Sequence, residues 1–322
     1  MHRVALDAMG GDFAPSETVA GAVQAVADGV DLTLVGDEPV IRSYLDGADV
    51  PITHASETIG MGDDVASAIR EKTESSISVC ARMVREGSAG ALVSAGSTGA
   101  AMAAAALIIG RSPKVLRPTI ATLFPTPGSP TIVLDSGANP EVKAEHLLQF
   151  AAMGEVLAES LYQLDQPRIG LLSNGEEKGK GRALEREAYE LLAASKLNFI
   201  GNVEGRDLVT DRADVFVTDG FSGNIFLKTA EGVAAMMAAM ALEEFGDLTP
   251  EAAAEVMPRF GRIRGRLDSE QTGGAYLLGV QGVVIIAHGS SSRVAIANAV
   301  KMASDSAEHD LPARVAARIS EL

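Results

Sequence analysis

Four short apolar runs in this chain each break into a loop of small residues, rich in glycine and hydroxyl groups, that leads toward a helical pattern. The loops begin at Ser94, Ser173, Thr218 and Ala287. At the carboxyl end of a strand, such a loop points backbone N–H groups and hydroxyls outward, beside the positive end of a helix dipole. It can receive phosphate or a developing oxyanion, although glycine and serine also serve ordinary turns. Four such loops predict one crevice lined by several strand ends, where open α/β sheets bind their ligands.

The rest of the chain supports an α/β fold, because short apolar runs alternate with segments of 3.6-residue periodicity. The expected strands are 4–6, 32–35, 91–93, 120–123, 132–134, 168–172, 215–217 and 283–286. The expected helices are 16–27, 77–86, 98–109, 141–159, 182–194 and 291–307. This alternation predicts a mostly parallel sheet with helices on both faces. The proline-rich segment 124–130 cannot be a central strand and is interpreted as a connection between two strands.

One region, 224–266, shows two helical patterns and no strand signal. The first pattern is rich in alanine and methionine through Phe245, and the second begins at Thr249 as N-cap with Pro250 at the first helical position. The short link 246–248 predicts an antiparallel helical hairpin. The second arm ends in the densest positive charge of the chain, which belongs to Arg259, Arg262, Arg264 and Arg266. A solvated face or a dimer surface is the simpler interpretation of that cluster.

The composition excludes several classes of protein. Lys and Arg number 27 against 43 Asp and Glu, a formal net charge of −16, which disfavours nucleic acid as a partner. The single cysteine, Cys80, leaves no internal disulfide or cysteine metal cluster, and it is expected to be a small core thiol. No signal peptide is expected. Each of the longest apolar stretches, 100–109 and 233–242, is half of what a bilayer crossing needs, so we expect a cytoplasmic protein without a membrane span.

The loops offer several groups for phosphate or acyl chemistry. A lysine in loop 174–181 can pair with phosphate or with charge on a carbonyl oxygen, although a solvated charged turn is an equal alternative. Asn224, at a helix start after Gly223, is either a cap or an amide donor to a carbonyl oxygen. The acidic loops 7–12 and 135–140 suggest tight turns, with Mg²⁺ binding as the rarer alternative. His288 is either a base or phosphate ligand, or it satisfies its own loop.

The missing motifs narrow the chemistry further. No G-x-G-x-x-G follows the first expected strand, and no G-x-x-x-x-G-K-[ST] occurs, so dinucleotide and nucleoside triphosphate binding lose their usual anchors. No G-x-S-x-G elbow occurs either, which disfavours a serine hydrolase. A site of neutral donors with one lysine fits direct transfer, in which phosphate itself attacks an acyl carbonyl.

Several long motifs in fixed order resemble those of the bacterial phosphate:acyl-(acyl-carrier-protein) acyltransferases (PlsX-type), which make acyl-phosphate for phospholipid synthesis. The motifs are 6–12, 93–100, 135–139, 219–224, 227–229, 274–279 and 288–289, and they extend over nearly the whole chain. The resemblance implies a doubly wound, three-layer α/β/α fold of the isocitrate dehydrogenase and phosphotransacetylase type. It implies one domain over 1–322, with a protruding helical hairpin, 224–268, inserted in it, and a homodimer.

The resemblance also implies the roles of particular residues. Lys180, which precedes a glycine and a helix, and Asn224 correspond to the family's two critical positions; Lys178 also precedes a glycine. The expected phosphate and substrate contacts are Gly10, Gly11, Ser94, Gly96, Ser97, Thr98, Gly99, Asn139, Asp219, Ser222, Gly223 and His288. Where the family usually has Asn-Ile-Gly, this chain has Ser173-Asn174-Gly175, which displaces the strand-end asparagine by one position.

The implied partners are acyl-carrier protein, inorganic phosphate as a substrate, and a downstream membrane glycerol-phosphate acyltransferase; no cofactor and no metal are expected. We expect Arg259, Arg262, Arg264 and Arg266 to dock the acidic carrier, since a net-acidic protein needs a local positive patch for it. Phe245 and Leu248, at the hairpin turn, are the expected contacts for peripheral membrane association. The alternatives are a phosphotransacetylase acting on acyl-coenzyme A and a membrane-docked scaffold of lipid synthesis.

Overall fold

The computed structural model describes residues 3–60, 62–126, 130–267 and 269–322, and these build one 11-stranded sheet. Its order is β3-β2-β1-β4-β11-β10-β5-β6-β9-β7-β8. The strands are β1 (Val4–Asp7), β2 (Leu32–Gly36), β3 (Ile52–His54), β4 (Ala91–Ser94), β5 (Thr119–Phe124), β6 (Thr131–Leu134), β7 (Ile169–Leu172), β8 (Phe199–Val203), β9 (Val215–Val217), β10 (Ala275–Leu278) and β11 (Val283–Ile286).

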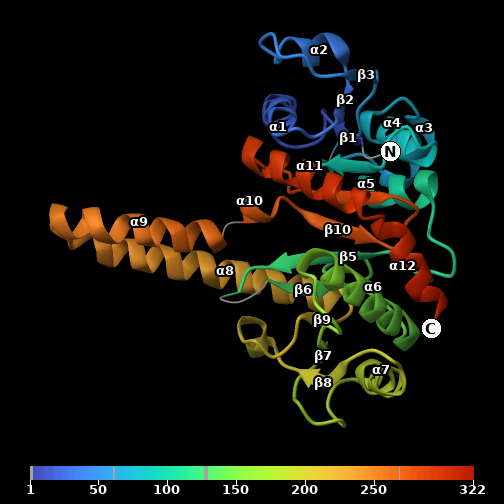
Figure 1. Ribbon diagram of the computed structural model, residues 1–322, viewed down its shortest axis with the longest axis vertical. Helices are drawn as coiled ribbons and strands as arrows, with labels where there is room; N and C mark the ends of the chain where they lie inside the picture. Colours follow the sequence, from blue (N-terminus) through green and yellow to red (C-terminus); the bar gives the residue numbers. More distant parts are fainter. Residues whose placement is uncertain (1–2, 61, 127–129, 268) are drawn as a thin grey trace.

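Helices connect and cover these strands (Figure 1). They are α1 (Ser16–Ala27), α2 (Glu38–Arg42), α3 (Val65–Glu71), α4 (Ser76–Arg85), α5 (Thr98–Ala104), η1 (Ala105–Ile109), α6 (Ala144–Tyr162), α7 (Ala183–Ala194), η2 (Gly205–Val209), α8 (Gly220–Glu244), η3 (Phe245–Asp247), α9 (Pro250–Leu267), α10 (Ser269–Thr272), α11 (Arg293–Glu308) and α12 (Leu311–Ser320).

The sheet consists of two parallel groups of strands that run in opposite directions. The group β3-β2-β1-β4-β11 is parallel throughout, as is the group β6-β9-β7-β8. Between them, β10 is antiparallel to β11 and β5, and β5 is antiparallel to β6. The prediction of a mostly parallel sheet is confirmed, and the reversal at β10 and β5 separates the loops of one group from those of the other.

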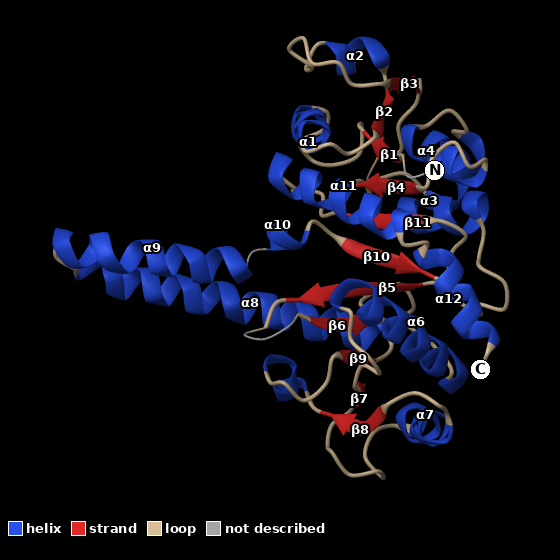
Figure 2. Cartoon of the chain, in the orientation of Figure 1, coloured by secondary structure: helices blue, strands red, loops and turns tan. Residues whose placement is uncertain are grey.

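Side chains of alternate strand residues enter cores on opposite faces of the sheet, as the two-residue period requires. In β1, Val4 and Leu6 belong to a core that also contains residues of α1, α6, α7, α11 and α12. Ala5 belongs to a core with α4, α5 and η1 on the other face, where α8 packs against the β6–β9 half. Figure 2 shows these helices on both sides of the strands. The predicted three-layer arrangement is confirmed.

All eight expected strands are present, and each expected helix is present within a few residues of its expected ends. The segment expected as one helix over 98–109 ends in the π-helical turn η1. Three strands were not expected: β3, β8 and β10. Cys80 is fully buried, and burial raises the pKa of its thiol well above the ordinary value, so it is the core thiol that was predicted.

The predicted hairpin is confirmed and projects far from the sheet as α8 and α9 (Figure 1). Its first helix begins at Gly220, directly after β9, rather than at 224, and Asp268 lies outside the described residues. At the turn, the rings of Phe245 and Phe260 pack edge to face, with centroids 5.3 Å apart. The segment 127–129 of the proline-rich connection also lies outside the described residues.

Helix α8 is longer and more apolar than the uninterrupted apolar stretches of the sequence had indicated, and this corrects the expectation that no segment is long enough to span a membrane. The segment Gly220–Asp247, 28 residues with a mean hydropathy of 1.5, is long and apolar enough to cross a membrane by length and composition alone. Only 6% of its most apolar window is buried within the chain, and exposed apolar side chains line the hairpin. These are Val233, Met236, Met237, Met240, Leu242, Met257 and Ile263. Much of this apolar surface is therefore left without a partner inside one copy of the chain.

Candidate functional site

The loops that follow β1 and β4 meet around the buried carboxylate of Asp7. Ser94 Oγ donates to Asp7 Oδ2 at 2.7 Å, and the Gly96 N–H donates to Ser94 Oγ at 3.1 Å. Burial raises the pKa of Asp7, and hydrogen bonds from Ser76 and Ser94 offset part of that rise. A Cβ on Gly10 would lie 2.5 Å from Asp7 Oδ2 and 2.9 Å from the Gly96 nitrogen, so this position requires glycine. Asp7 thus holds the predicted Gly10 and Ser94 loops together.

The loop after β11 joins the same cluster. The N–H of Asp12, which follows Gly11, donates to the Gly289 carbonyl at 2.7 Å, and the Ala287 N–H donates to the Ser94 carbonyl at 2.9 Å. His288 Nδ1 lies 2.8 Å from Ser290 Oγ, which fits the interpretation that His288 satisfies its own loop. The predicted residues Gly10, Ser94, Gly96 and Ser97 line one small cavity here, and Thr98 and Gly99 begin the helix behind it.

A second cluster forms where β6 and β9 end, around the buried Asp135. Its carboxylate accepts the backbone N–H groups of Gly137, Ala138 and Asn139 at 3.1, 2.9 and 2.7 Å. These N–H groups therefore turn inward, and Asp135 is the self-bonded turn residue rather than a cation ligand. The side chain of Asn139 donates to the Pro118 carbonyl at 2.7 Å and to Asp135 at 2.8 Å, so it braces the loop. Within the described residues, no cluster of three or more His, Cys, Asp or Glu side chains is arranged to hold a metal ion.

The start of α8 lies directly against this loop. Asp219 is the N-cap and accepts from the Ser222 N–H at 2.8 Å and from Ser222 Oγ at 2.9 Å. A Cβ on Gly223 would lie 1.9 Å from the Asp135 carbonyl oxygen, so only glycine allows this close approach of the two backbones. Asn224 is exposed, and its Nδ2 donates to the Ser136 carbonyl at 3.3 Å. The amide is therefore held at the mouth of the loop.

The two lysines of loop 174–181 differ in what they bind. Lys178 Nζ lies 2.9 Å from Glu190 and 5.6 Å from the centre of the Tyr189 ring, and the hydrogen bond to Glu190 raises its pKa. Lys180 Nζ lies 3.9 Å from Glu177, and its side chain is 48% exposed. Lys178 is thus engaged by α7, whereas Lys180 stays at the loop. This difference supports Lys180 as the functional lysine.

Sequence reasoning missed Arg182, which joins the lysine loop to α8. Its Nε donates to Glu185 at 2.9 Å, and its Nη2 pairs with Asp219. Asp219 has a side chain only 2% exposed; burial acts to raise its pKa, but hydrogen bonds from Ser222 and Arg182 outweigh that and lower it. The only signal in the sequence was the place of Arg182, two residues after Lys180 at an expected helix start.

Not all predicted site residues come together. Hydrogen bonds and backbone contacts connect the loops within each cluster, but no hydrogen bond or ion pair among the described residues connects the two clusters or joins Lys180 to Asn224. Because the two parallel groups run in opposite directions, the loops after β4 and β11 lie at one edge of the sheet and those after β7 and β9 at the other. The prediction that all four strand ends line one crevice at a shared edge is therefore wrong. Arg182 and Asp219 provide the contact between the Lys180 loop and the Asn224 helix.

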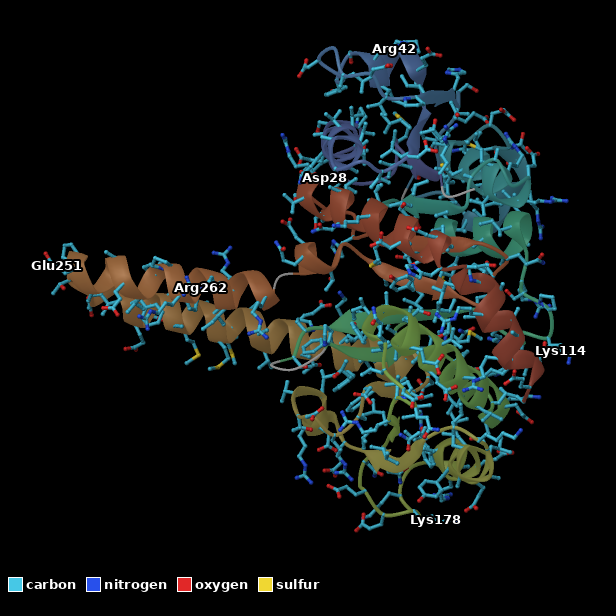
Figure 3. All side chains as sticks on the ribbon, in the orientation of Figure 1. Asp28, Arg42, Lys114, Lys178, Glu251 and Arg262 are labelled. Carbon is cyan, nitrogen blue, oxygen red and sulfur yellow. The ribbon has the colours of Figure 1, made fainter. Side chains whose placement is uncertain are left out.

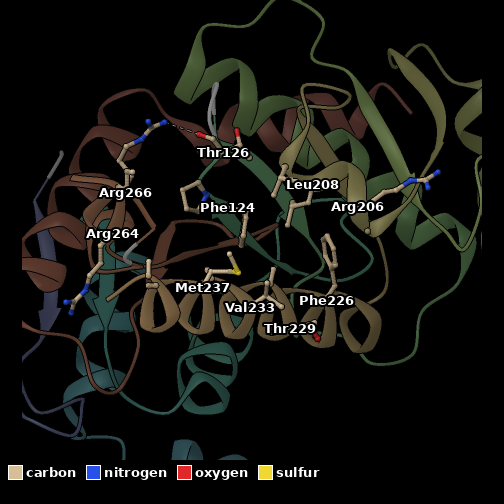
Figure 4. A pocket seen from close by; sticks show the side chains of 18 of the residues that line it. Phe124, Thr126, Arg206, Leu208, Phe226, Thr229, Val233, Met237, Arg264 and Arg266 are labelled. Atoms are coloured by element: carbon tan, nitrogen blue, oxygen red, sulfur yellow. Dashed lines mark hydrogen bonds between the residues drawn. The ribbon is translucent and has the colours of Figure 1, made fainter. Parts of the chain in front are cut away.

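A large apolar groove, which sequence reasoning also missed, runs along the base of the hairpin (Figure 4). Its volume is about 890 Å³. Phe226, Val233 and Met237 of α8 point into it, opposite Leu208 and Phe124. The helical pattern rich in alanine and methionine predicted a helix but did not indicate which residues would face it.

The predicted carrier-docking arginines do not form one patch. Arg259 pairs with Glu255 at 3.0 Å, whereas Arg264 and Arg266 lie at the edge of the groove, where Arg266 donates to the Thr126 carbonyl at 3.3 Å. Arg262 is exposed along the hairpin (Figure 3). At the tip, Phe245 and Leu248 are half-buried, because Phe245 packs on Phe260 within the hairpin.

The sequence and its folded form are similar to known proteins. Residues 2–314 match the family described as "Fatty acid synthesis protein". A phosphate acyltransferase from Desulforamulus reducens is 46% identical over 317 residues, which is 97% of this chain and 95% of that protein. The chain belongs to the phosphate acyltransferase family. A second phosphate acyltransferase, from Trichlorobacter lovleyi, is 44% identical over 327 residues, 99% of this chain and 95% of that protein.

The solved structure of a phosphotransacetylase from Streptococcus pyogenes resembles this phosphate acyltransferase over 95% of the chain and 94% of its own length. The TM-score is 0.66 and the sequence identity 19%. At that identity the likeness concerns the fold alone, and it confirms the phosphotransacetylase-like fold that was predicted.

Proposed function

We propose that this phosphate acyltransferase transfers a fatty acyl group from acyl-(acyl-carrier protein) to inorganic phosphate and yields acyl-phosphate for phospholipid synthesis. The observation that carries the proposal is the junction at Arg182 and Asp219, which fastens the loop of Lys180 to the first turn of the helix that bears Asn224. A lysine and an amide donor at two helix starts suit phosphate and a developing oxyanion. The phosphate acyltransferase relatives support the reaction class.

In the proposed reaction, a phosphate oxygen attacks the thioester carbonyl carbon. The C–O bond forms, the C–S bond breaks, and the carrier thiol leaves with the proton. Lys180 holds the phosphate dianion, and the Asn224 amide donates to the carbonyl oxygen as negative charge develops there. The reaction needs neither a cofactor nor a metal ion.

The carrier protein is proposed as the donor because a strongly acidic domain needs a local positive patch on a chain of net charge −16. Arg264 and Arg266 offer this charge at the edge of the groove, and Arg262 lies exposed farther along α9. Acyl-coenzyme A, the donor of the alternative phosphotransacetylase reaction, also carries phosphate charges, so the comparison of the two donors decides between them.

A homodimer is proposed to cover the exposed apolar side chains of the hairpin, since one copy leaves Val233, Met236 and Met240 about half exposed. The enzyme is proposed to act in the cytoplasm with peripheral contact to the inner face of the membrane through Phe245 and Leu248. That location would deliver the greasy product to a membrane glycerol-phosphate acyltransferase.

The purified enzyme, incubated with phosphate and either acyl-carrier protein or acyl-coenzyme A, tests this proposal. Acyl-phosphate is trapped with hydroxylamine and measured as the acyl hydroxamate. We expect product from the carrier-bound donor at a kcat/KM at least about tenfold above that from acyl-coenzyme A. Preference for acyl-coenzyme A would favour the phosphotransacetylase alternative. No acyl-phosphate from either donor would favour the scaffold.

A further inference from the structure

An arginine that binds two carboxylates, here called a clamp, lies at each end of the neighbouring strands β7 and β9. At their amino ends, Arg168 donates to Asp214 through Nε at 3.0 Å and through Nη2 at 2.8 Å, and it also binds Asp211. At their carboxyl ends, Arg182 binds Glu185 and Asp219. The first clamp joins the residues directly before β7 and β9, and the second joins the N-cap of α7 to the N-cap of α8. Only the second lies beside Lys180 and Asn224.

The two carboxylates at the second clamp are buried, and both are paired with the same arginine. The side chains of Asp219 and Glu185 are 2% and 8% exposed, and the Arg182 guanidinium, 58% exposed, faces both from the solvent side. A buried carboxylate needs a counterion or several hydrogen bonds. Arg182 fixes its own backbone too, because its N–H donates to Glu185 at 2.6 Å.

Each end of this clamp leads directly to a proposed catalytic group. Lys180 stands two residues before Arg182, with Gly181 between them at φ +93° and its N–H donating to Asn174 Oδ1 at 2.9 Å. Asp219 caps α8, so its position sets that of the first turn and hence of Asn224. A shift of the Arg182 fork therefore moves the lysine and the amide relative to each other.

From this arrangement we infer that Arg182 is a positioning residue for the proposed acyl transfer, which sets the separation of Lys180 and Asn224 by binding Asp219 and Glu185 together. The inference rests on the proposed function. Lysine cannot replace arginine here, because an ammonium group lacks the planar fork that reaches two carboxylates. A misplacement of about 1 Å can cost about 10²-fold in rate.

The test compares Arg182→Lys and Arg182→Gln with Arg168→Lys and Arg168→Gln as matched controls. Steady-state kinetics of acyl-phosphate formation and urea unfolding are measured for every variant, at a temperature where all are folded. We expect both Arg182 variants to lose about 10²-fold in kcat with KM for phosphate and acyl donor within about threefold of wild type. The Arg168 variants should lose stability but keep kcat within about threefold, since the amino ends of the strands carry no reacting group.

Three outcomes would overturn the inference. Equal losses of kcat in the Arg168 and Arg182 variants would make the clamp merely structural. A rise in KM for phosphate with kcat unchanged would make Arg182 a phosphate ligand instead. Full activity in Arg182→Lys would show that the fork is not needed. A wild-type enzyme that makes no acyl-phosphate would contradict the proposed function and, with it, this inference, whereas the three outcomes above overturn the inference alone.

Discussion

Replacing Gly223 by alanine probes the closest backbone approach in the site. The new Cβ would lie 1.9 Å from the Asp135 carbonyl oxygen and 2.9 Å from Thr218 Cγ2. Contacts of this kind are not found below 3.0 Å, so the two backbones must separate by at least 3.0 − 1.9 = 1.1 Å. The neighbouring atom belongs to a carbonyl that side-chain rotation cannot move. The start of α8 must therefore shift away from the loop.

That displacement should be felt first in catalysis. Moving α8 outward by about 1 Å would lengthen the hydrogen bond from Asn224 to Ser136, now 3.3 Å, and the bond from the Gly220 N–H to the Asn139 carbonyl, now 2.9 Å. Overpacking of this size costs about 1–3 kcal/mol in stability. A 1 Å misplacement of a reacting group costs about 10²-fold in rate. We expect Gly223→Ala to fold, to be less stable, and to lose about 10²-fold in kcat.

The assay is acyl-phosphate formation beside urea unfolding, with Gly232→Ala as control. Gly232 lies on the same helix, and a Cβ there would meet nothing within 4 Å. Its replacement should leave kcat unchanged and gain up to about 1 kcal/mol from helix propensity. If Gly223→Ala keeps kcat within about threefold of wild type, then the position of α8 does not set the rate and the reasoning from this contact is wrong.

Four further predictions follow from the same structure. Lys180→Ala should lower kcat by about 10²–10³-fold, whereas Lys178→Ala should keep nearly full activity because Lys178 is paired with Glu190. Equal losses of kcat in the two variants, measured by steady-state kinetics, would contradict the assignment of Lys180 as the functional lysine. Asn224→Ala should lower kcat by a similar factor and leave the thermal stability unchanged. Retained activity would show that Asn224 is a helix residue without a chemical role. Charge reversal at Arg262 and Arg264 should raise KM for the carrier-bound donor and weaken its salt dependence, and unchanged kinetics across ionic strength would make these arginines a solvated face. The pKa of Asp219 is lowered from the ordinary 3.8. The ionised Asp219 carboxylate therefore stabilises the folded state above that pH, and this stabilisation is lost as the pH falls through the pKa of the folded state. The stability gap between wild type and Arg182→Gln should thus be largest near neutrality and shrink in acid, and a gap independent of pH in urea unfolding would contradict the pairing.

The membrane prediction is tested by flotation with anionic liposomes, comparing wild type with Phe245→Asp/Leu248→Asp. The double variant should stay unbound and keep its synthesis of acyl-phosphate. Since Phe245 packs on Phe260, Phe260→Ala serves as a control for a loosened hairpin tip. Equal flotation of wild type and double variant would exclude the tip as the contact.

The sequence allowed the layered fold to be predicted because apolar runs and helical periodicity alternate almost without interruption. It did not indicate β10, an apolar run between Gly274 and Gly279 that is antiparallel to both neighbours. It did not indicate β8 either, since Gly201 and Asn202 interrupt the apolar pattern of an edge strand. The reversal between the two parallel groups depends on strand pairing, which periodicity does not report.

The site was predictable where a residue type has a local meaning. Gly223 allows helix α8 to approach the Asp135 carbonyl closely, and the loop 135–139, which follows β6, is held by the Asp135 carboxylate as a turn aspartate commonly holds its own backbone. Arg182 was not predictable, because its partner Asp219 lies 37 residues away and only the fold brings them together. The same holds for the separate engagement of Lys178, which depends on Glu190 in α7. The groove could not be predicted either, because its walls come from four segments that are far apart in the sequence.

The central claim is that inorganic phosphate itself attacks the acyl carbonyl, and isotope transfer measures this directly. The enzyme is supplied with acyl-(acyl-carrier protein) and phosphate labelled with ¹⁸O at every oxygen, and the acyl-phosphate is analysed by ³¹P NMR and mass spectrometry. Direct attack keeps the full label of the phosphate, including the oxygen that bridges carbon and phosphorus. Acyl-phosphate with an unlabelled bridging oxygen, or free fatty acid as the first product, would contradict the account.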